Sequence, residues 1–245
     1  MNILFTICAR AGSKGAAGKN IKLFCGRPLV YYTLEIYEKY RAKYRGENEI
    51  DLAVNTDSKQ LLRQIDDKGT KYIFVERKKE LAGDIIAKGA VIKDTVLAVE
   101  GMQGRQYELI VDLDLTSPLR YLTDVEGTID QVLQNERCNF AYSVVEARRS
   151  PYFNMVSKKD RGFFARVIPS DYTARQQVPE CFDMNASIYA YAREYLMDMR
   201  DDNQFALIWK MQDSAVLDID SEDDFEIMEL LTEYYWTKGR YLEIK

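Results

Sequence analysis

An alternation of short apolar runs with longer amphipathic segments constrains the fold of this chain more than any other feature. Residues 2–9 (NILFTICA) are rich in β-branched side chains and too short for a helix, so they predict a buried strand. Pro28 opens a segment in which apolar residues recur every three or four positions as far as Tyr40, which predicts a helix. A second strand is predicted at 51–55. This strand–helix–strand order is typical of a parallel sheet covered by helices.

The same alternation continues through the next ninety residues. Asp57 is placed to cap a helix that ends at Gly69, and a strand follows at 71–75. The further predicted elements are a helix over 87–100, a strand over 107–113, a helix over 124–136 and a strand over 140–145. We therefore predict an α/β fold with a doubly wound sheet, and 245 residues fit a single domain, 1–245.

Residues 146–183 interrupt this pattern with short polar pieces and three prolines, which predicts an arm of hairpins inserted in the domain. The arm has too few apolar residues for a core of its own, yet four of its aromatic side chains need burial: Tyr152, Phe153, Phe163 and Phe164. They pack either on the chain's own core or on a second copy. A strand returns at 186–192, and Ser221 with Asp224 predicts the start of a last helix.

The composition excludes whole classes of chemistry. The chain contains no histidine, which removes Ser-His-Asp and Cys-His nucleophiles, histidine zinc sites and imidazole acid–base catalysis. Its four cysteines are far apart in sequence, which favours reduced thiols. No apolar run reaches the roughly 18 residues of a membrane helix, and no signal peptide is visible, so we expect no membrane partner and a cytoplasmic protein.

The charge is unevenly distributed. A net charge of −5 argues against a nucleic-acid partner, but the first 34 residues contain five basic and no acidic side chains. Three glycines of the loop that follows the first strand are spaced G-x-x-G-x-x-G, which fits neither the dinucleotide-binding fingerprint nor the P-loop. Glycines still let backbone N–H groups approach a phosphate, and lysines and arginine offset its charge. The loop is therefore interpreted as a phosphate site, the alternative being a flexible basic turn.

Five segments, in order along the whole chain, resemble the CMP-sugar synthetases, the sialate-type cytidylyltransferases. They are TICARAGSKGAAGKNI at the first loop, ERKKELAGD around Arg77, DLDLTSPLR from Asp112 to Arg120, TARQQ from Thr173 to Gln177 and LDID from Leu217 to Asp220. The resemblance implies a Rossmann-like, GT-A-like nucleotide-diphospho-sugar transferase fold of three layers, with a mainly parallel sheet and a small dimerisation arm. It also implies a homodimer.

The resemblance assigns roles to the matching positions. CTP contacts fall on Ala9, Arg10, Gly12, Ser13, Lys14, Lys19, Asn20, Arg77 and Lys88. Contacts to the acceptor sugar fall on Asp114, Thr116, Arg166, Arg175, Gln176 and Asn185, with the two arginines reaching the partner subunit's site. The resemblance implies Asp218 and Asp220 as Mg²⁺ ligands, and as residues two apart in an extended segment they can face the same side. Arg10, Lys14, Asp218 and Asp220 are the implied catalytic groups.

Two positions depart from the sialate pattern: Asp114 replaces the glutamine of Q-P-T-S-P-L-R, and Lys88 replaces a serine. Together with RRSPYFN and FDMNASIY, these residues resemble the legionaminate branch of the family. Asp114 is interpreted as a contact to the sugar, and the alternative is a second carboxylate beside Asp112 near the metal.

The implied reaction joins CTP to the anomeric hydroxyl of a nonulosonic acid, either a legionaminate-type sugar or N-acetylneuraminate, and releases pyrophosphate. Without histidine, the proton must pass to a carboxylate or to the coordination shell of the metal. Three alternatives remain: a CMP-Kdo or other sugar nucleotidyltransferase, a glycosyltransferase that uses Asp112 and Asp114 as its D-x-D site, and a nucleotide-binding protein without catalysis.

Overall fold

A single sheet organises the chain in the computed structural model, which describes residues 1–12, 18–83, 85–198 and 206–245. Within these residues seven strands hydrogen-bond in the order β11-β7-β10-β6-β1-β4-β5. The strands are β1 (Asn2–Cys8), β4 (Glu49–Thr56), β5 (Ile73–Glu76), β6 (Leu109–Leu113), β7 (Phe140–Glu146), β10 (Phe182–Ala192) and β11 (Ala206–Lys210). A small separate hairpin joins β2 (Leu23–Phe24) to β3 (Arg27–Pro28).

The sheet is mostly parallel. β1 runs parallel to both β4 and β6, β4 to β5, and β7 to β11. β10 alone among these strands runs antiparallel to its two neighbours, β6 and β7. The predicted mainly parallel α/β sheet is confirmed, and the carboxyl ends of β1, β4, β5 and β6 share one edge.

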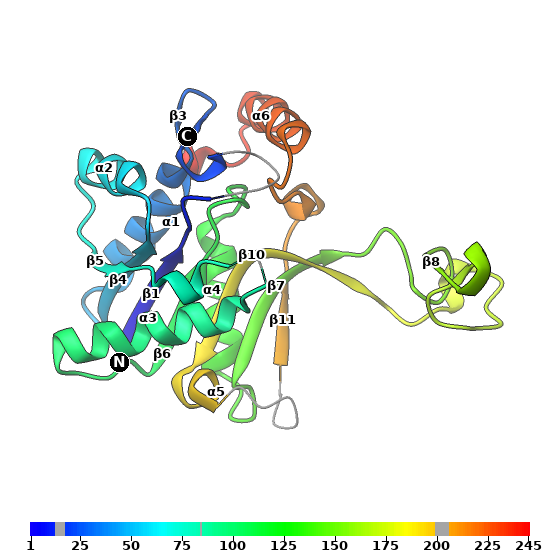
Figure 1. Ribbon diagram of the computed structural model, residues 1–245, viewed down its shortest axis with the longest axis horizontal. Helices are drawn as coiled ribbons and strands as arrows, with labels where there is room; N and C mark the ends of the chain where they lie inside the picture. Colours follow the sequence, from blue (N-terminus) through cyan, green and yellow to red (C-terminus); the bar gives the residue numbers. More distant parts are fainter. Residues whose placement is uncertain (13–17, 84, 199–205) are drawn as a thin grey trace.

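Helices cover both faces of the sheet and make three layers (Figure 1). They are α1 (Leu29–Tyr44), α2 (Lys59–Lys68), α3 (Lys88–Gln103), α4 (Leu122–Leu133), α5 (Arg193–Asp198) and α6 (Glu222–Thr237). Side chains alternate along β1, so that Phe5 packs on Tyr37 of α1 at 5.3 Å between ring centres, while Leu4 joins the core under α3 and α5. Of the described helices, none combines the length and apolar character that crossing a membrane requires.

Most predicted elements are present, with shifts of a few residues at their ends. One predicted cap is wrong: the Ser58 hydroxyl, not Asp57, accepts the Leu61 N–H at 3.2 Å and caps α2. Asp57 instead accepts the Ala11 N–H at 2.6 Å and so fixes the start of the first loop. The reciprocal cap between Ser221 and Asp224 at the start of α6 is confirmed.

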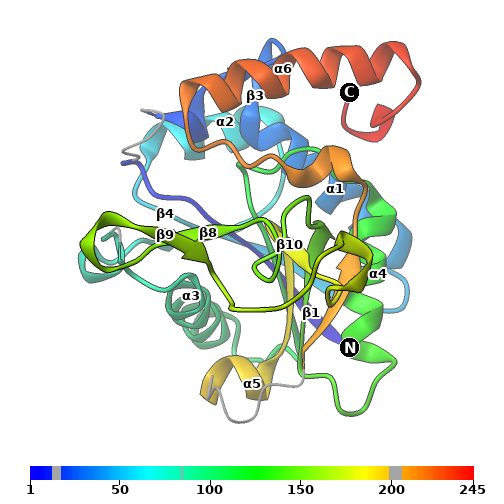
Figure 2. The same ribbon diagram turned by 90° about the vertical axis from the view of Figure 1, so that its right-hand side faces the viewer.

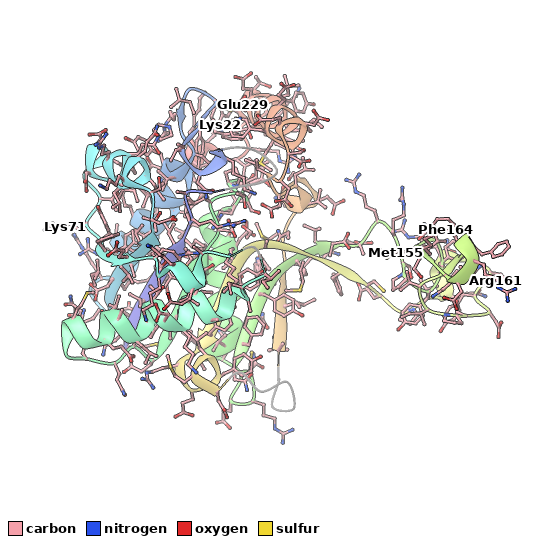
Figure 3. The ribbon with its side chains drawn as sticks, viewed as in Figure 1. Lys22, Lys71, Met155, Arg161, Phe164 and Glu229 are labelled. Carbon is pink, nitrogen blue, oxygen red and sulfur yellow. The ribbon has the colours of Figure 1, made fainter. Side chains whose placement is uncertain are left out.

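Between β7 and β10 the chain leaves the sheet and forms the arm, which extends away from the three layers in Figure 1 and points toward the viewer in Figure 2. It carries the antiparallel pair β8 (Val156–Lys158) and β9 (Phe164–Arg166). Figure 3 shows Met155, Arg161 and Phe164 at its far end. Phe163 and Phe164 are 71% and 67% exposed there, so in a single copy their apolar surface is left uncovered.

Candidate active site

A cavity of about 570 Å³ opens at the carboxyl ends of β1 and β6. Open α/β sheets bind ligands at this edge, because loops from neighbouring strands converge there. Predicted site residues that line it are Ala9, Arg10, Gly12, Lys19, Asn20, Arg77, Lys88, Asp114, Thr116, Asp218 and Asp220. The fold therefore assembles residues that are more than two hundred positions apart in sequence.

The first loop supplies one wall of the cavity. Asn20 donates from its side-chain amide to the Arg10 carbonyl at 3.1 Å, and Arg10 donates to the Ala82 carbonyl at 3.3 Å. These bonds tie the loop to itself and to the segment before α3. Ser13 and Lys14, both predicted to bind the CTP phosphates, lie outside the described residues.

Arg77 also lines the cavity and is only 8% exposed. Its guanidinium donates to the Asn55 side-chain oxygen, to the Asn55 carbonyl at 3.3 Å and to the Leu81 carbonyl at 3.4 Å. Asn55 is itself fixed, since its amide donates to Thr95 Oγ1 at 2.9 Å. A buried guanidinium held by neutral acceptors keeps its positive charge available for an anion in the cavity.

Two carboxylates and an ammonium form the acidic floor, which we define as Asp112, Asp114 and Lys88. Lys88 Nζ lies 2.8 Å from Asp112 Oδ2 and 2.6 Å from Asp114 Oδ2. Burial opposes the charged form of Lys88, but the two carboxylates outweigh it and hold the pKa of Lys88 well above its ordinary value. Burial likewise favours the neutral acid at Asp114, yet Lys88 and Thr116 hold its pKa below the usual range.

Asp218 and Asp220 also line the cavity and lie just before α6. Burial, with the negative charges of Asp114 and Asp220, raises the pKa of Asp218. Asp220 is exposed and pairs with Lys19 at 3.0 Å, and Lys19 also donates to the Ile219 carbonyl. Lys19 thereby links the first loop to the two aspartates.

The segment from Asp114 to Arg120 is held from inside the protein. Arg120 is fully buried and donates to the carbonyls of Asp114, Ser117 and Ser187. Burial lowers the pKa of Arg120 to about 10, against the effect of the nearby aspartates. Asn185 is 3% exposed and bonds to Ser143 and the Ala215 carbonyl, so it supports the cavity from behind.

The predicted arm residues lie outside this cavity. Arg166 donates to the Ser170 carbonyl at 2.9 Å and lies over the Phe153 ring, within the arm. Arg175 donates to the Ala147 carbonyl at 3.2 Å, and with Gln176 it lines a separate cavity of about 230 Å³ at the arm's base. Within one chain, these three side chains are not brought to the site.

Sequence reasoning missed the residues that hold the site together. Asn55, Asp57 and Arg120 hydrogen-bond to neighbouring groups, and the Tyr189 ring centre lies 4.9 Å from Lys88 Nζ. A weak signal existed for two of them, since Asn55 ends an apolar strand and Arg120 ends the T-S-P-L-R segment. Asp57 and Tyr189 carry no signal of their own, because their partners come from remote parts of the chain.

Comparison with known proteins identifies the family. Residues 4–237 match the family model described as cytidylyltransferase. The chain is 35% identical to the post-translational flagellin modification protein B of Campylobacter coli and 35% identical to the CMP-N,N'-diacetyllegionaminic acid synthase of Campylobacter jejuni, in each case covering 94% of both chains. It is 27% identical to an N-acylneuraminate cytidylyltransferase of Streptococcus agalactiae over 92% of this chain and 52% of that protein.

A solved structure shares the fold. A CMP:2-keto-3-deoxy-manno-octonic acid synthetase complexed with CTP superposes with a TM-score of 0.66 at 17% identity, covering 96% of this chain and all of the other. The predicted three-layer nucleotidyltransferase fold is thus confirmed. With a family model that matches nearly the whole chain, the protein belongs to the cytidylyltransferase family and is a nucleotidyltransferase.

Proposed function

We propose that this protein transfers CMP from CTP to the anomeric hydroxyl of a nonulosonic acid and releases pyrophosphate. The observation that carries the proposal is the cavity, which is lined by Arg10, Lys19 and Arg77 together with Asp218 and Asp220. The cations suit a triphosphate, and the two neighbouring carboxylates suit a divalent ion bound to it. The similarity to CMP-sugar-forming relatives over nearly the whole chain supports the same reaction.

Mg²⁺ fits the residues at Asp218 and Asp220. Mg²⁺ is commonly held by one or two carboxylates together with substrate phosphates and water, so a full protein cage is not needed. Among the described residues no group of three or more potential side-chain ligands is arranged around a metal position, so the proposed ion would take its other ligands from phosphate and water. Bound there, Mg²⁺ would neutralise phosphate charge and polarise the reacting phosphoryl group.

The chain's own residues supply placement and charge. The oxygen of the anomeric hydroxyl forms a bond to the α-phosphorus as the bond to the bridging oxygen breaks, and pyrophosphate leaves with that electron pair. Arg10 and Lys19 stabilise the charge that moves onto the leaving group, and Arg77 holds the nucleotide. The proton of the hydroxyl passes to a carboxylate, the only type of anionic side chain that lines the cavity in the described part of the chain.

We further propose a legionaminate-type sugar as the acceptor. The relative from Campylobacter jejuni named for diacetyllegionaminic acid matches at 35% identity, compared with 27% for the N-acylneuraminate relative. The glycosyltransferase alternative needs Asp112 and Asp114 free to bind a metal. It is disfavoured because Asp112 is fully buried and both carboxylates are paired with Lys88.

Position-specific labelling tests the reaction itself. Label in the α-phosphate of CTP is expected in the sugar product, and label in the γ-phosphate is expected in pyrophosphate. A glycosyltransferase would consume a preformed nucleotide sugar and produce neither result. We also propose that the protein acts in the cytoplasm, where CTP is available, and that it has no nucleic-acid partner, since its net charge is −5.

We propose a homodimer in which the arm of one copy completes the site of the other. The exposed Phe163 and Phe164 need a cover, and Arg175 does not reach the cavity of its own chain. Light scattering at micromolar concentration is expected to give the dimer mass, and Phe163→Ser with Phe164→Ser is expected to give a monomer. A wild-type protein with the mass of a monomer would contradict the proposed dimer.

Complementation tests the action between subunits. Arg175→Ala and Asp220→Asn are each expected to be nearly inactive, yet a co-expressed equal mixture is expected to regain about a quarter of wild-type activity, because half of the dimers carry one intact site. No recovery in mixed dimers would contradict a role for the arm across the interface.

A further inference from the structure

The acidic floor holds its own cation. Lys88 Nζ bridges Asp112 Oδ2 at 2.8 Å and Asp114 Oδ2 at 2.6 Å, and it lies 4.9 Å from the centre of the Tyr189 ring. Two carboxylates within reach of one ammonium would repel each other strongly without it.

In each carboxylate one oxygen accepts hydrogen bonds from threonine groups and the other oxygen lies beside the Lys88 ammonium. Asp112 accepts the Thr6 hydroxyl on Oδ1 at 2.6 Å, and Asp114 accepts the Thr116 N–H and hydroxyl on Oδ1 at 3.1 and 2.8 Å. The second oxygen of each faces Lys88. Thr6 and Asp112 are paired across β1 and β6, and Asp112 and Tyr189 across β6 and β10, so one face of the sheet fixes this geometry.

The position of Lys88 is explained by these partners and not by its helix. It is the first residue of α3, whose first turn contains no acidic side chain. A cation at a helix N-terminus faces the positive end of the helix dipole, typically at a cost of 0.3–1 kcal/mol. The two carboxylates and the aromatic ring offset that cost. Carboxylate oxygens that converge in this way are also the ligands that Mg²⁺ and Mn²⁺ prefer.

We propose that the Lys88 ammonium is a permanent cation in a position that would otherwise bind a second divalent ion. Phosphoryl-transfer sites with two metals hold both ions on carboxylates that lie close together. Here Asp112 and Asp114 carry a lysine instead, which leaves Asp218 and Asp220 for the divalent ion. Lys88 is thus a positioning residue that aims Asp114 and limits the site to one metal. Only the placement of that metal rests on the proposed function.

Mn²⁺ binding to the protein without nucleotide or sugar tests this inference, with free Mn²⁺ counted by electron paramagnetic resonance. Lys88→Met is expected to bind one Mn²⁺ per chain more than the wild type. The double variant Lys88→Met/Asp114→Asn is expected to lose that extra ion. Lys43→Met is the matched control, because Lys43 pairs with the Glu126 carboxylate at 2.8 Å on the surface. It is expected to keep the wild-type count.

An equal Mn²⁺ count in Lys88→Met and the wild type would overturn the inference. So would a wild-type Mn²⁺ that is lost in Asp114→Asn, since a metal would then share the floor with Lys88. If Lys88→Met is unstable without metal, its melting temperature measures the same equilibrium. Mn²⁺ is expected to raise the melting temperature of Lys88→Met more than the melting temperature of the wild type, and equal increases would contradict the proposal. These readouts use no substrate, so they stand apart from the success or failure of the proposed reaction.

Discussion

Asp220→Asn is expected to lower the turnover number about 10²-fold or more, the range for loss of one electrostatic group at a reacting centre. The exposed carboxylate has no part in the core, so the variant is expected to fold and melt like the wild type. The concentration of Mg²⁺ needed for half-maximal activity should rise as well. Steady-state pyrophosphate release over a range of Mg²⁺ concentrations measures both effects.

Asp223→Asn is the control for this variant. Asp223 lies three residues further on, in the first turn of α6, is exposed and does not line the cavity. The same chemical change there is expected to leave turnover unaltered. Near-wild-type turnover in a folded Asp220→Asn protein would contradict the assignment of Asp218 and Asp220 to the metal.

Arg120→Met is expected to destabilise the protein by about 3–5 kcal/mol, the range for removing one member of a buried charged network. The variant removes the Arg120 hydrogen bonds to the carbonyls of Asp114, Ser117 and Ser187 and takes a positive charge away from the aspartates around it. For a domain of this size, the melting temperature should fall on the order of 10 °C. Denaturant unfolding and thermal melting both measure the change.

Arg137→Met provides the comparison, because Arg137 is exposed and follows α4 at the surface. Its removal is expected to change the unfolding free energy by less than about 0.5 kcal/mol, as for most surface substitutions. If Arg120→Met were no less stable than Arg137→Met, the buried guanidinium would not be holding the segment from Asp114 to Arg120.

The fold was predictable where hydrophobic periodicity and local capping agree. β1, α1 and α6 follow from apolar spacing and from Pro28 or Ser221 near their starts. β11 was not predicted, because an edge strand of five half-buried or exposed residues has little periodic signal. Asp57 was wrongly predicted as the cap of α2 because Asp57 and Ser58 are both suitable capping residues. Only the tertiary contact of Asp57 with Ala11 leaves the capping role to Ser58.

The site was predictable as a set of residues but not as an arrangement. Sequence motifs named Lys88 and Asp114 separately, the first as a nucleotide contact and the second as a sugar contact. Their ion pair joins the start of α3 to the end of β6, a contact that no local pattern encodes. The role of Arg120 could not be predicted from its motif, because its burial and its three acceptors depend on how β10 returns beside β6.

The most direct test of the central claim is pyrophosphate release from CTP and Mg²⁺ with four acceptors: N-acetylneuraminate, di-N-acetyllegionaminate, pseudaminate and Kdo. The account predicts CTP-dependent release that is far higher with di-N-acetyllegionaminate than with the other three. Dominance of N-acetylneuraminate would retain the reaction and reject the legionaminate assignment. No release with any acceptor, in a protein shown to bind CTP, would contradict the proposed function.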